Sequence, residues 1–285
     1  MEILRTIDEV RRACKDLKRG DRTLGLVPTM GALHDGHLSL VRVAKAGCDA
    51  VAATIFVNPK QFAPNEDFAA YPRTFEADCA MLEHEGVDVL FAPAPEEMYP
   101  AGAETFVDVP LVGGRLDGAS RPGHFRGVAT VVAKLFNIFQ PTRAFFGQKD
   151  AAQVAVLRTM VRDLNFDVEM VVCPTVREID GLAMSSRNRY LSAEERKQAL
   201  ALGHSLRQME TAVARGERDT AKLRDALRDE LKTAKAIRFD YAEIVDVRTL
   251  KSVSDVSQGA LVAVAAWVGK TRLIDNVVLR PEAAQ

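Results

Sequence analysis

Short apolar runs alternate with amphipathic stretches along the first 174 residues of the chain. The runs are rich in β-branched and aromatic residues and predict buried strands at 23–27, 50–57, 87–91, 144–146 and 168–172, with a shorter strand at 106–109. Apolar residues recur at helical spacing from His37 onward and at 73–85, 128–139 and 150–164, which predicts helices there. Strands that alternate with helices favour βαβ units and a Rossmann-like, doubly wound parallel α/β sheet.

The first 20 residues carry charge throughout, so they are unlike a signal peptide. Their apolar members fall on one helical face and predict a single amphipathic helix: Ile3, Ile7, Val10, Cys14 and Leu17. The strand that follows is expected to end at Pro28, because proline cannot donate to a sheet ladder.

After Pro174 the pattern changes to a turn-rich connector and then to a smaller unit. Ser192 to Glu195 forms a capping box that starts a helix, and a second helical stretch follows Gly216. Strands are predicted at 239–245, 261–268 and 273–279, the last two joined by a hairpin turn at Gly269–Lys270. We therefore expect a larger, Rossmann-like domain at 1–174 and a smaller α+β domain at 175–285.

Composition places the chain among ordinary globular proteins, with 285 residues, 47% of them hydrophobic and 27% charged. A net charge of −1 offers no electrostatic reason to bind nucleic acid or an anionic membrane. The four cysteines are widely spaced and form no metal pattern, so we expect buried thiols in a reducing compartment. The longest uncharged apolar run, 260–269, is too short to span a bilayer, and a cytoplasmic location is expected.

Polar residues follow the predicted strands at the edge where ligands bind in doubly wound folds. Each strand end supplies its own group: Met30, His34 and His37; Asn58, Lys60 and Gln61; Gly147 to Asp150 with Gln153; and Val176 with Met184 to Asn188. These groups are expected to converge on one site.

His34 and His37 bracket Gly36 at a helix entrance, where free backbone N–H groups favour phosphate. The simpler explanation is a pair of turn histidines bonded to nearby carbonyl groups. A zinc site is the third alternative, although no third and fourth ligand is evident nearby. The strand–turn–helix context favours phosphate binding.

Two other loops have the chemistry of a polyphosphate site. In GQKD, Lys149 can hold phosphates and Asp150 can accept a ribose hydroxyl, or Asp150 can simply cap the next helix. In MSSRN, two hydroxyl groups precede Arg187, whose guanidinium can hold two oxygens at once, although such a segment can also be a plain linker. The basic segment 120–127, SRPGHFRG, is either a mobile lid or a surface loop.

Taken together, these segments resemble a known family. MGALHDGH is similar to the HxGH signature of the nucleotidyltransferase superfamily, and MSSRN resembles its second phosphate loop. With IFVNPKQF, YPRT, SRPGHFRGV, FFGQKD, DGLAMSSRNRYL and AAWVGKTRLIDN in this order, the chain closely resembles the pantothenate synthetase (pantoate–β-alanine ligase) family over nearly its full length. The resemblance implies an ATP-dependent ligase that forms pantothenate through pantoyl adenylate and releases AMP and pyrophosphate.

The resemblance also implies a role for each matching residue. His37 corresponds to the proton donor, and His34, Lys149 and Arg187 are the other expected catalytic groups. Gln61 and Gln153 would bind pantoate, with Gln61 also beside β-alanine. The expected ATP-binding residues are Met30, Gly31, Ala32, Leu33, His34, Asp35, Gly36, His37, Gly147, Gln148, Lys149, Asp150, Val176, Met184, Ser185, Ser186 and Arg187. Mg²⁺ would accompany ATP without a predicted protein ligand, and the family implies a homodimer. By the same resemblance, the domain at 1–174 would bind the nucleotide and pantoate, and the domain at 175–285 would close over it as a lid.

Three alternatives stay open at this stage. Another nucleotidyltransferase would need a cationic pocket for a second phosphate, whereas Gln61 and Gln153 suggest a neutral hydroxy acid. A tRNA synthetase is disfavoured by size and by the lack of a basic module. A catalytically silent nucleotide-binding regulator would be expected to show damage in one of the three loops.

Overall fold

Six parallel strands form the first sheet, in the order β1-β4-β3-β2-β5-β6. The structure is a computed structural model that describes residues 1–64, 66, 68–232, 234 and 237–280. The strands are β1 (Glu2–Leu4), β2 (Leu24–Thr29), β3 (Ala50–Ile55), β4 (Val89–Phe91), β5 (Arg143–Gly147) and β6 (Glu169–Cys173). The predicted doubly wound parallel sheet is confirmed.

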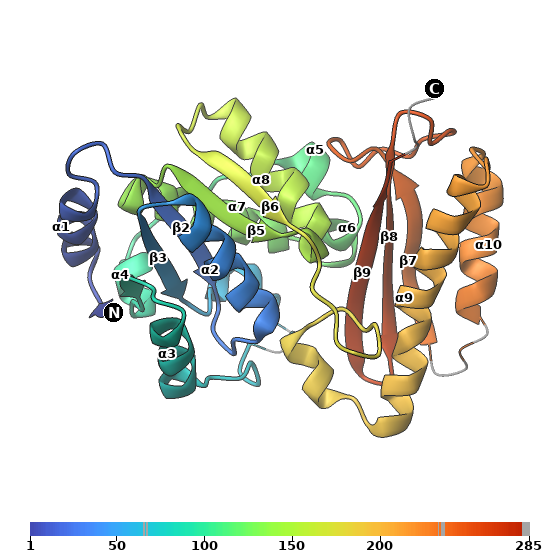
Figure 1. The fold of residues 1–285 in the computed structure, drawn as a ribbon, viewed down its shortest axis with the longest axis horizontal. Coiled ribbons are helices and arrows are strands. Elements are labelled where there is room, and N and C mark those ends of the chain that lie inside the picture. The colour runs from blue at the N-terminus through green and yellow to red at the C-terminus, as the bar shows by residue number, and fades with distance from the viewer. Residues whose placement is uncertain (65, 67, 233, 235–236, 281–285) are drawn as a thin grey trace.

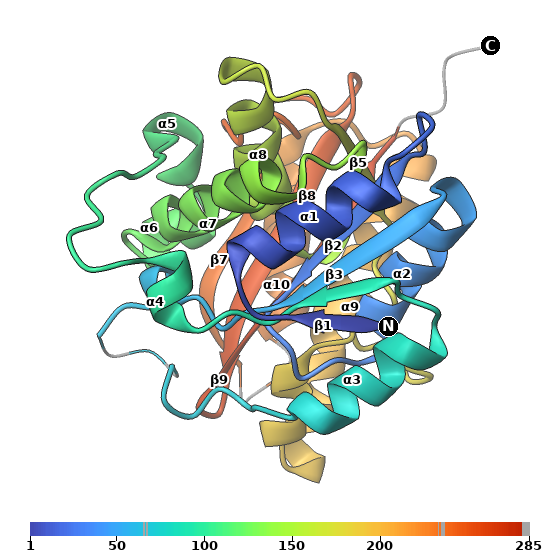
Figure 2. The ribbon, with the colours of Figure 1, turned by 90° about the vertical axis from the view of Figure 1, so that its left-hand side faces the viewer.

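Helices cover both faces of this sheet (Figures 1 and 2). They are α1 (Ile7–Leu17), α2 (Asp35–Gly47), α3 (Phe75–His84), α4 (Pro95–Met98), α5 (Pro110–Gly113), α6 (Asp117–Ser120), α7 (His124–Phe139) and α8 (Ala151–Asp163). Short 3₁₀ turns lie at η1 (Pro59–Gln61), η2 (Gln148–Asp150) and η3 (Ser186–Tyr190).

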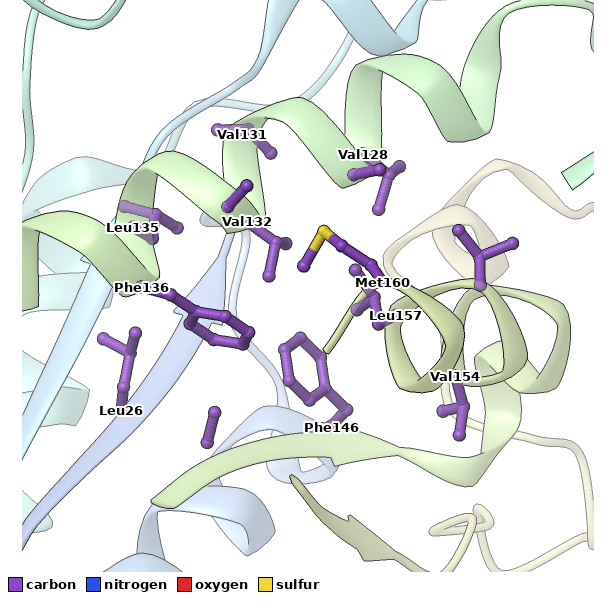
Figure 3. Packing of buried hydrophobic residues seen from close by; sticks show 14 of the residues in the cluster. Leu26, Val128, Val131, Val132, Leu135, Phe136, Phe146, Val154, Leu157 and Met160 are labelled. Carbon is purple, nitrogen blue, oxygen red and sulfur yellow. The ribbon is translucent and has the colours of Figure 1, made fainter. Parts of the chain in front are cut away.

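Alternation along the strands divides the core between the two faces. Leu26 of β2 and Phe146 of β5 belong to the cluster formed with α7 and α8, which Figure 3 shows from close by. The next residue of β2, Val27, packs instead with Leu40 and Val41 of α2 on the opposite face. Successive strand residues point to opposite faces, so runs of purely apolar residues are what a sheet covered on both sides requires.

The C-terminal part has its own antiparallel sheet, in the order β7-β8-β9. Its elements are α9 (Ala193–Ala214), α10 (Thr220–Lys232), β7 (Ile237–Val245), β8 (Ala260–Val268) and β9 (Thr271–Leu279). The predicted capping box at Ser192 and the turn at Gly269–Lys270 are both present. One sheet face packs against the two helices, while Leu261 and Ala263 of β8 join the core of the first part. Figure 1 shows this smaller α+β unit beside the first sheet, and the division at residue 174 stays a prediction.

The prediction of one N-terminal helix was wrong at its start. Residues Glu2–Leu4 form β1, which pairs with β4, and the side chain of Ile3 is 43% exposed instead of facing the core. Thr6 then caps α1 in a capping box with Glu9. The cap fixes where the helix begins, and the pairing with β4 could not be read from local periodicity.

Pro28 does not end its strand, which was a second error. β2 continues to Thr29, and Pro28 lies opposite Thr54 of β3. Thr29 N–H donates to Thr54 Oγ1, whereas Leu24 C=O accepts from Thr142 on the other side. Alternation therefore points the proline nitrogen toward β5, whose pairing with β2 runs through Gly25 and Leu26 only. The missing N–H costs no ladder bond there.

The predicted strand at 106–109 was also wrong. Val107 N–H donates to Thr130 Oγ1 of α7 at 3.0 Å, so this segment lies along a helix. Pro110 then begins the short α5. Of the four cysteines, all of them free, Cys14 and Cys173 are buried and Cys48 and Cys79 are half-buried. Within the described residues, no helix is both long and apolar enough to cross a membrane.

Candidate active site

The strand order of the first sheet reverses between β2 and β5. From β2 the chain proceeds outward to β3 and β4, and from β5 it proceeds to β6 on the other side. Ligands of doubly wound sheets bind in the crevice outside the strand ends at this point. Residues 30–37 follow β2 and residues 147–150 follow β5, so the topology places both predicted loops at the crevice.

A cavity opens at this crevice and gathers most of the predicted site residues. Those that line it are Met30, His34, Gly36, His37, Gln61, Gly147, Lys149, Asp150, Gln153, Val176, Met184, Ser185, Ser186 and Arg187. A second cavity adjoins it between the two sheets, and Lys149, Ser185 and Arg187 line both. The predicted convergence of strand ends is therefore what the structure has, while the role of each residue stays a prediction.

The rings of His34 and His37 lie close together, tilted by 36°, at the start of α2. Their ring centroids are 4.1 Å apart, and His34 Nδ1 accepts a hydrogen bond from Gly36 N–H at 3.1 Å. A neutral His34 that accepts at Nδ1 carries its proton on Nε2. A Cβ on Gly36 would lie 2.8 Å from the His34 ring, so a larger residue here would displace that ring. One nitrogen of His34 therefore has a role in the turn, although its partner is an N–H group and not the carbonyl that the turn explanation expects, and the other nitrogen is left for a ligand.

Both imidazoles are held in the neutral form. Burial, together with the nearby His34 and Lys149, lowers the pKa of His37 to about 3. Burial and the charge of Lys149 likewise lower the pKa of His34. His37 Nδ1 is buried and has no hydrogen-bond partner among the described residues. A buried polar atom without a partner costs about 1–3 kcal/mol, which marks it as a position where a ligand would be stabilising.

The backbone just before HDGH is held by a residue that the sequence analysis did not single out. Asp78 of α3 is buried and accepts from the N–H groups of Ala32 and Leu33, each at 2.9 Å. Ala32 has φ +50°, a conformation that costs an L-residue about 1–2 kcal/mol, and these bonds offset the cost. Gly31, Ala32 and Leu33 therefore shape the loop and do not line the cavity, and Asp35 is exposed beside Arg42.

In the GQKD turn two polar side chains face the cavity and the third faces away from it. Lys149 Nζ lies 3.8 Å from Asp150 Oδ1, and both residues line the cavity. Asp150 occupies the N-cap position of α8, but its side chain makes no capping hydrogen bond. The capping explanation is therefore not supported. Gln148 faces away from the cavity, where its amide donates to Asn276 of β9 at 3.0 Å.

The connector brings Val176 and the MSSRN segment together as a narrow hairpin. Met184 N–H donates to Val176 C=O at 3.0 Å, and Ser185 Oγ accepts from Arg187 N–H to cap η3. Asn188 is buried and donates to the Ala183 carbonyl and to Glu178. These bonds hold the two serines and Arg187 at the edge of the cavity.

Gln61 lies at the opposite wall and is buried instead of solvated. Its Oε1 accepts from Asn58 Nδ2 at 3.0 Å, and its Nε2 lies 2.9 Å from Met30 Sδ. Asn58 also donates to Gly127 C=O of α7, so η1 is fixed against that helix. The wall beside it is apolar and consists of Val128, Val131, Val132 and Leu135. Such a wall suits a substrate that has both hydroxyl and methyl groups.

The segment 120–127 divides between the end of α6, a short turn and the start of α7. Arg121 makes two hydrogen bonds to Glu66, at 2.6 and 2.7 Å. His124 Nδ1 lies 2.8 Å from the Gln61 carbonyl oxygen, and burial beside Arg121 lowers the pKa of His124 to about 4. Arg121 and His124, both from the SRPGHFRG segment, line both cavities. Whether this segment is a mobile lid stays a prediction.

Metal ligation by side chains has little support. No group of three or more His, Cys, Asp or Glu residues that could hold a metal ion occurs among the described residues. The zinc alternative for His34 and His37 therefore lacks the further ligands that it needs.

Known proteins resemble this chain over nearly its full length. The model of the family described as pantoate-beta-alanine ligase matches residues 2–278. The pantothenate synthetase of Acidobacterium capsulatum is 64% identical over 96% of this chain and 95% of its own length. That of Thermotoga neapolitana is 57% identical over 98% of this chain and 100% of its own.

Solved structures show the same fold. The crystal structure of pantothenate synthetase from Thermus thermophilus has a TM-score of 0.92 and 49% identity, and covers 97% of this chain and 99% of its own. The pantoate-β-alanine ligase of Francisella tularensis, complexed with β,γ-ATP and β-alanine, has a TM-score of 0.80 and 34% identity over 98% of this chain and 97% of its own. Among the alternatives that the sequence left open, these similarities favour the ligase, and the chain belongs to the pantoate–β-alanine ligase family.

Proposed function

We propose that this cavity joins (R)-pantoate to β-alanine in two steps through a pantoyl adenylate. In the first step, a carboxylate oxygen of pantoate attacks the α-phosphorus of ATP, and the bond from that phosphorus to the bridging oxygen of pyrophosphate breaks. In the second step, the β-alanine amine attacks the acyl carbon. The acyl C–O bond breaks, AMP leaves with that oxygen, the amine loses its proton, and pantothenate forms.

A single observation supports this assignment: one cavity combines donors for a polyphosphate with a pocket for a methylated hydroxy acid. Lys149 follows β5 and Ser186 and Arg187 follow β6, whereas Gln61 follows β3 on the other side of β2, beside the apolar face of α7. Pantoate carries two hydroxyl groups, a carboxylate and two geminal methyl groups, which match amide donors and a valine wall. The reacting carboxylate would then meet the α-phosphorus between these two groups of residues.

His34 and His37 would act as neutral hydrogen-bond donors at the phosphates. Negative charge grows on the pyrophosphate side of the transition state, and donors fixed in place stabilise it without reorganising. Both pKa values are lowered, so at neutral pH each ring offers one N–H instead of a full positive charge. The cationic contribution comes from Lys149 and Arg187, which line the same cavity.

Mg²⁺ would enter bound to ATP. Asp150 is the one acidic residue among the described residues that line the first cavity, so it would supply at most a single carboxylate. Phosphate oxygens and water would supply the remaining ligands, and the ion would neutralise part of the phosphate charge.

The remaining parts of the assignment concern the whole protein. The C-terminal part, from residue 175, would act as a lid over the nucleotide, because the second cavity lies between the two sheets. Exclusion of water would protect the mixed anhydride from hydrolysis. A homodimer in the cytoplasm is the expected setting.

Substrate omission tests this function. The protein is mixed with ATP, Mg²⁺ and pantoate, and pyrophosphate and AMP are followed with and without β-alanine. We expect pantoate-dependent pyrophosphate release without β-alanine, limited to about one equivalent per site, and turnover to AMP once β-alanine is added. Pyrophosphate release that ignores pantoate would contradict the adenylation step.

Gln61→Ala tests the acid pocket. Loss of a buried amide that faces the substrate should raise the KM for pantoate by about tenfold, a binding loss of about 1.4 kcal/mol, and leave ATP affinity within about twofold. Initial rates at varied pantoate and varied ATP separate the two effects. An effect confined to ATP would assign Gln61 to the nucleotide instead.

A further inference from the structure

Two neighbouring residues of β9 bind the two nucleotide loops, and one of them, Asp275, also lines the second cavity. Asn276 is buried, and its Nδ2 donates to the carbonyl oxygens of Gln148 at 3.0 Å and Lys149 at 2.8 Å. Its Oδ1 accepts from Gln148 Nε2 at 3.0 Å. The whole hydrogen-bonding capacity of this side chain except one lone pair is therefore spent on the GQKD turn.

Asp275 holds the other loop. Its carboxylate is buried and binds Arg177 through two hydrogen bonds, from Nη1 at 2.7 Å and Nη2 at 3.0 Å. Arg177 directly follows Val176, which lines the cavity, and also donates to the Gly181 carbonyl. The hairpin that carries the serines of MSSRN is thus anchored at its base to Asp275.

The alternation of side chains along β9 explains how two adjacent residues bind two different loops. Consecutive side chains of a strand point to opposite faces, so Asp275 and Asn276 reach two different partners from adjacent positions. Asn276 lies opposite Ala263, whose side chain joins the core of the first part, and Asp275 lies opposite Val264, which packs with α9 and α10. Figure 1 shows β9 at the edge of the second sheet.

We propose that Asp275 and Asn276 are positioning residues that fix the spacing between the GQKD turn and the Val176–Arg187 segment. Neither is assigned to contact the nucleotide. A triphosphate bridges Lys149 on one loop and Arg187 on the other, so its affinity depends on the separation of the two loops. This inference rests on the proposed function, because it takes ATP as the ligand of both loops.

A merely structural role is the competing explanation. Buried polar contacts between two sheets also hold the sheets together, and their loss would then lower stability without a selective effect on ATP. Arg115 offers a matched control, because its Nη1 donates to the Thr249 carbonyl at 2.7 Å and also links the two parts, away from both loops.

The first experiment measures equilibrium binding of α,β-methylene-ATP with Mg²⁺ by calorimetry. Asn276→Ala removes both donors to the turn, and we expect affinity to fall about five- to fifty-fold, with the pantoate KM within about twofold of the parent. Asn276→Asp keeps the shape but has no N–H to donate, so it should lose at least as much. Arg115→Ala should bind the analogue like the parent protein.

The second experiment asks whether Asn276 acts through Lys149. In a double-mutant cycle, Asn276→Ala should weaken the analogue by less than about twofold once Lys149 has been changed to alanine, because the turn then has no ammonium to position. Additive losses would overturn the proposal. So would parent-like affinity of either Asn276 variant, or an equal loss in Arg115→Ala. Failure of the parent protein itself to bind the analogue would instead count against the proposed function.

Discussion

At the scale of single residues, the two neighbouring imidazoles have different roles. His34 caps α2 through Nδ1, which fixes its own ring, and His37 keeps a buried nitrogen without a partner among the described residues. The sequence could place both histidines at a helix entrance because strand, turn and helix signals are local. It could not show that burial makes them neutral, since the surrounding residues come from distant segments.

His37→Ala tests the residue-scale interpretation. The side chain supports no helix cap, so the fold should stay intact while pantoate-dependent pyrophosphate release slows by about 10²- to 10³-fold. Circular dichroism and initial rates measure the two properties. The matched control is His84→Ala, an exposed histidine in the last turn of α3, which should change neither. An unfolded His37→Ala protein, or one with near-normal rates, would be inconsistent with this role.

At the scale of elements, the central strands were predictable and the pairings at the periphery were not. Long apolar runs specify β2 and β3 wherever they pair, but β1 exists only because β4 offers it an edge. Pro28 stays within β2 because its nitrogen faces a side where pairing has stopped. Where these strands begin and end depends on a neighbouring strand, and the local sequence pattern does not reveal which strand that is.

The contact between η1 and α7 gives an element-scale prediction. A Cβ on Gly127 would lie 2.2 Å from the Lys60 carbonyl oxygen, so alanine would push η1 and Gln61 away from the helix. At an ordinary position inside a helix, replacing glycine by alanine stabilises the protein by about 0.5–1 kcal/mol. Gly127→Ala should nevertheless lower the melting temperature and raise the pantoate KM.

Gly47→Ala is the matched control for that variant. Gly47 is the last residue of α2, and its nearest neighbour is a side-chain nitrogen of Arg143 at 3.3 Å, which can move. We expect a small change in melting temperature and none in the pantoate KM. Stabilisation of the protein by Gly127→Ala would show that the close approach to η1 does not matter.

At the scale of the whole molecule, the site is assembled from residues far apart in the chain. Asp78 holds the backbone of Ala32 and Leu33, and Asn276 holds the turn at Gln148 and Lys149. Neither Asp78 nor Asn276 belongs to a recognisable motif, because a buried hydrogen-bond partner produces no local periodicity or spacing in the sequence. The loops themselves carry motifs, which is why the candidate site was largely predictable and its support was not.

The buried histidines give the whole fold an acid sensitivity. The pKa values of His37 and His124 are about 3 and about 4, against about 6.5 when unfolded. Below pH 6.5 the unfolded chain takes up protons that the folded chain does not, so stability falls as the pH drops toward 4. At pH 5 each histidine should account for roughly 2 kcal/mol of that loss.

Urea unfolding at pH 7 and pH 5 measures this effect. His124→Gln keeps an amide donor near the Gln61 carbonyl but cannot take up a proton in this range. The variant should lose about 2 kcal/mol less than the parent protein between the two pH values. An identical loss in both proteins would mean that His124 is not held neutral by the fold.

The central claim is that pantoate is activated as an acyl adenylate, and an isotope measurement tests it most directly. Pantoate labelled with ¹⁸O in its carboxylate is turned over with ATP, Mg²⁺ and β-alanine, and the AMP is analysed by mass spectrometry. The attacking carboxylate oxygen stays with phosphorus when the amine displaces AMP, so AMP should carry one ¹⁸O atom per pantothenate formed. Unlabelled AMP would contradict the adenylate and with it the chemistry assigned to this site.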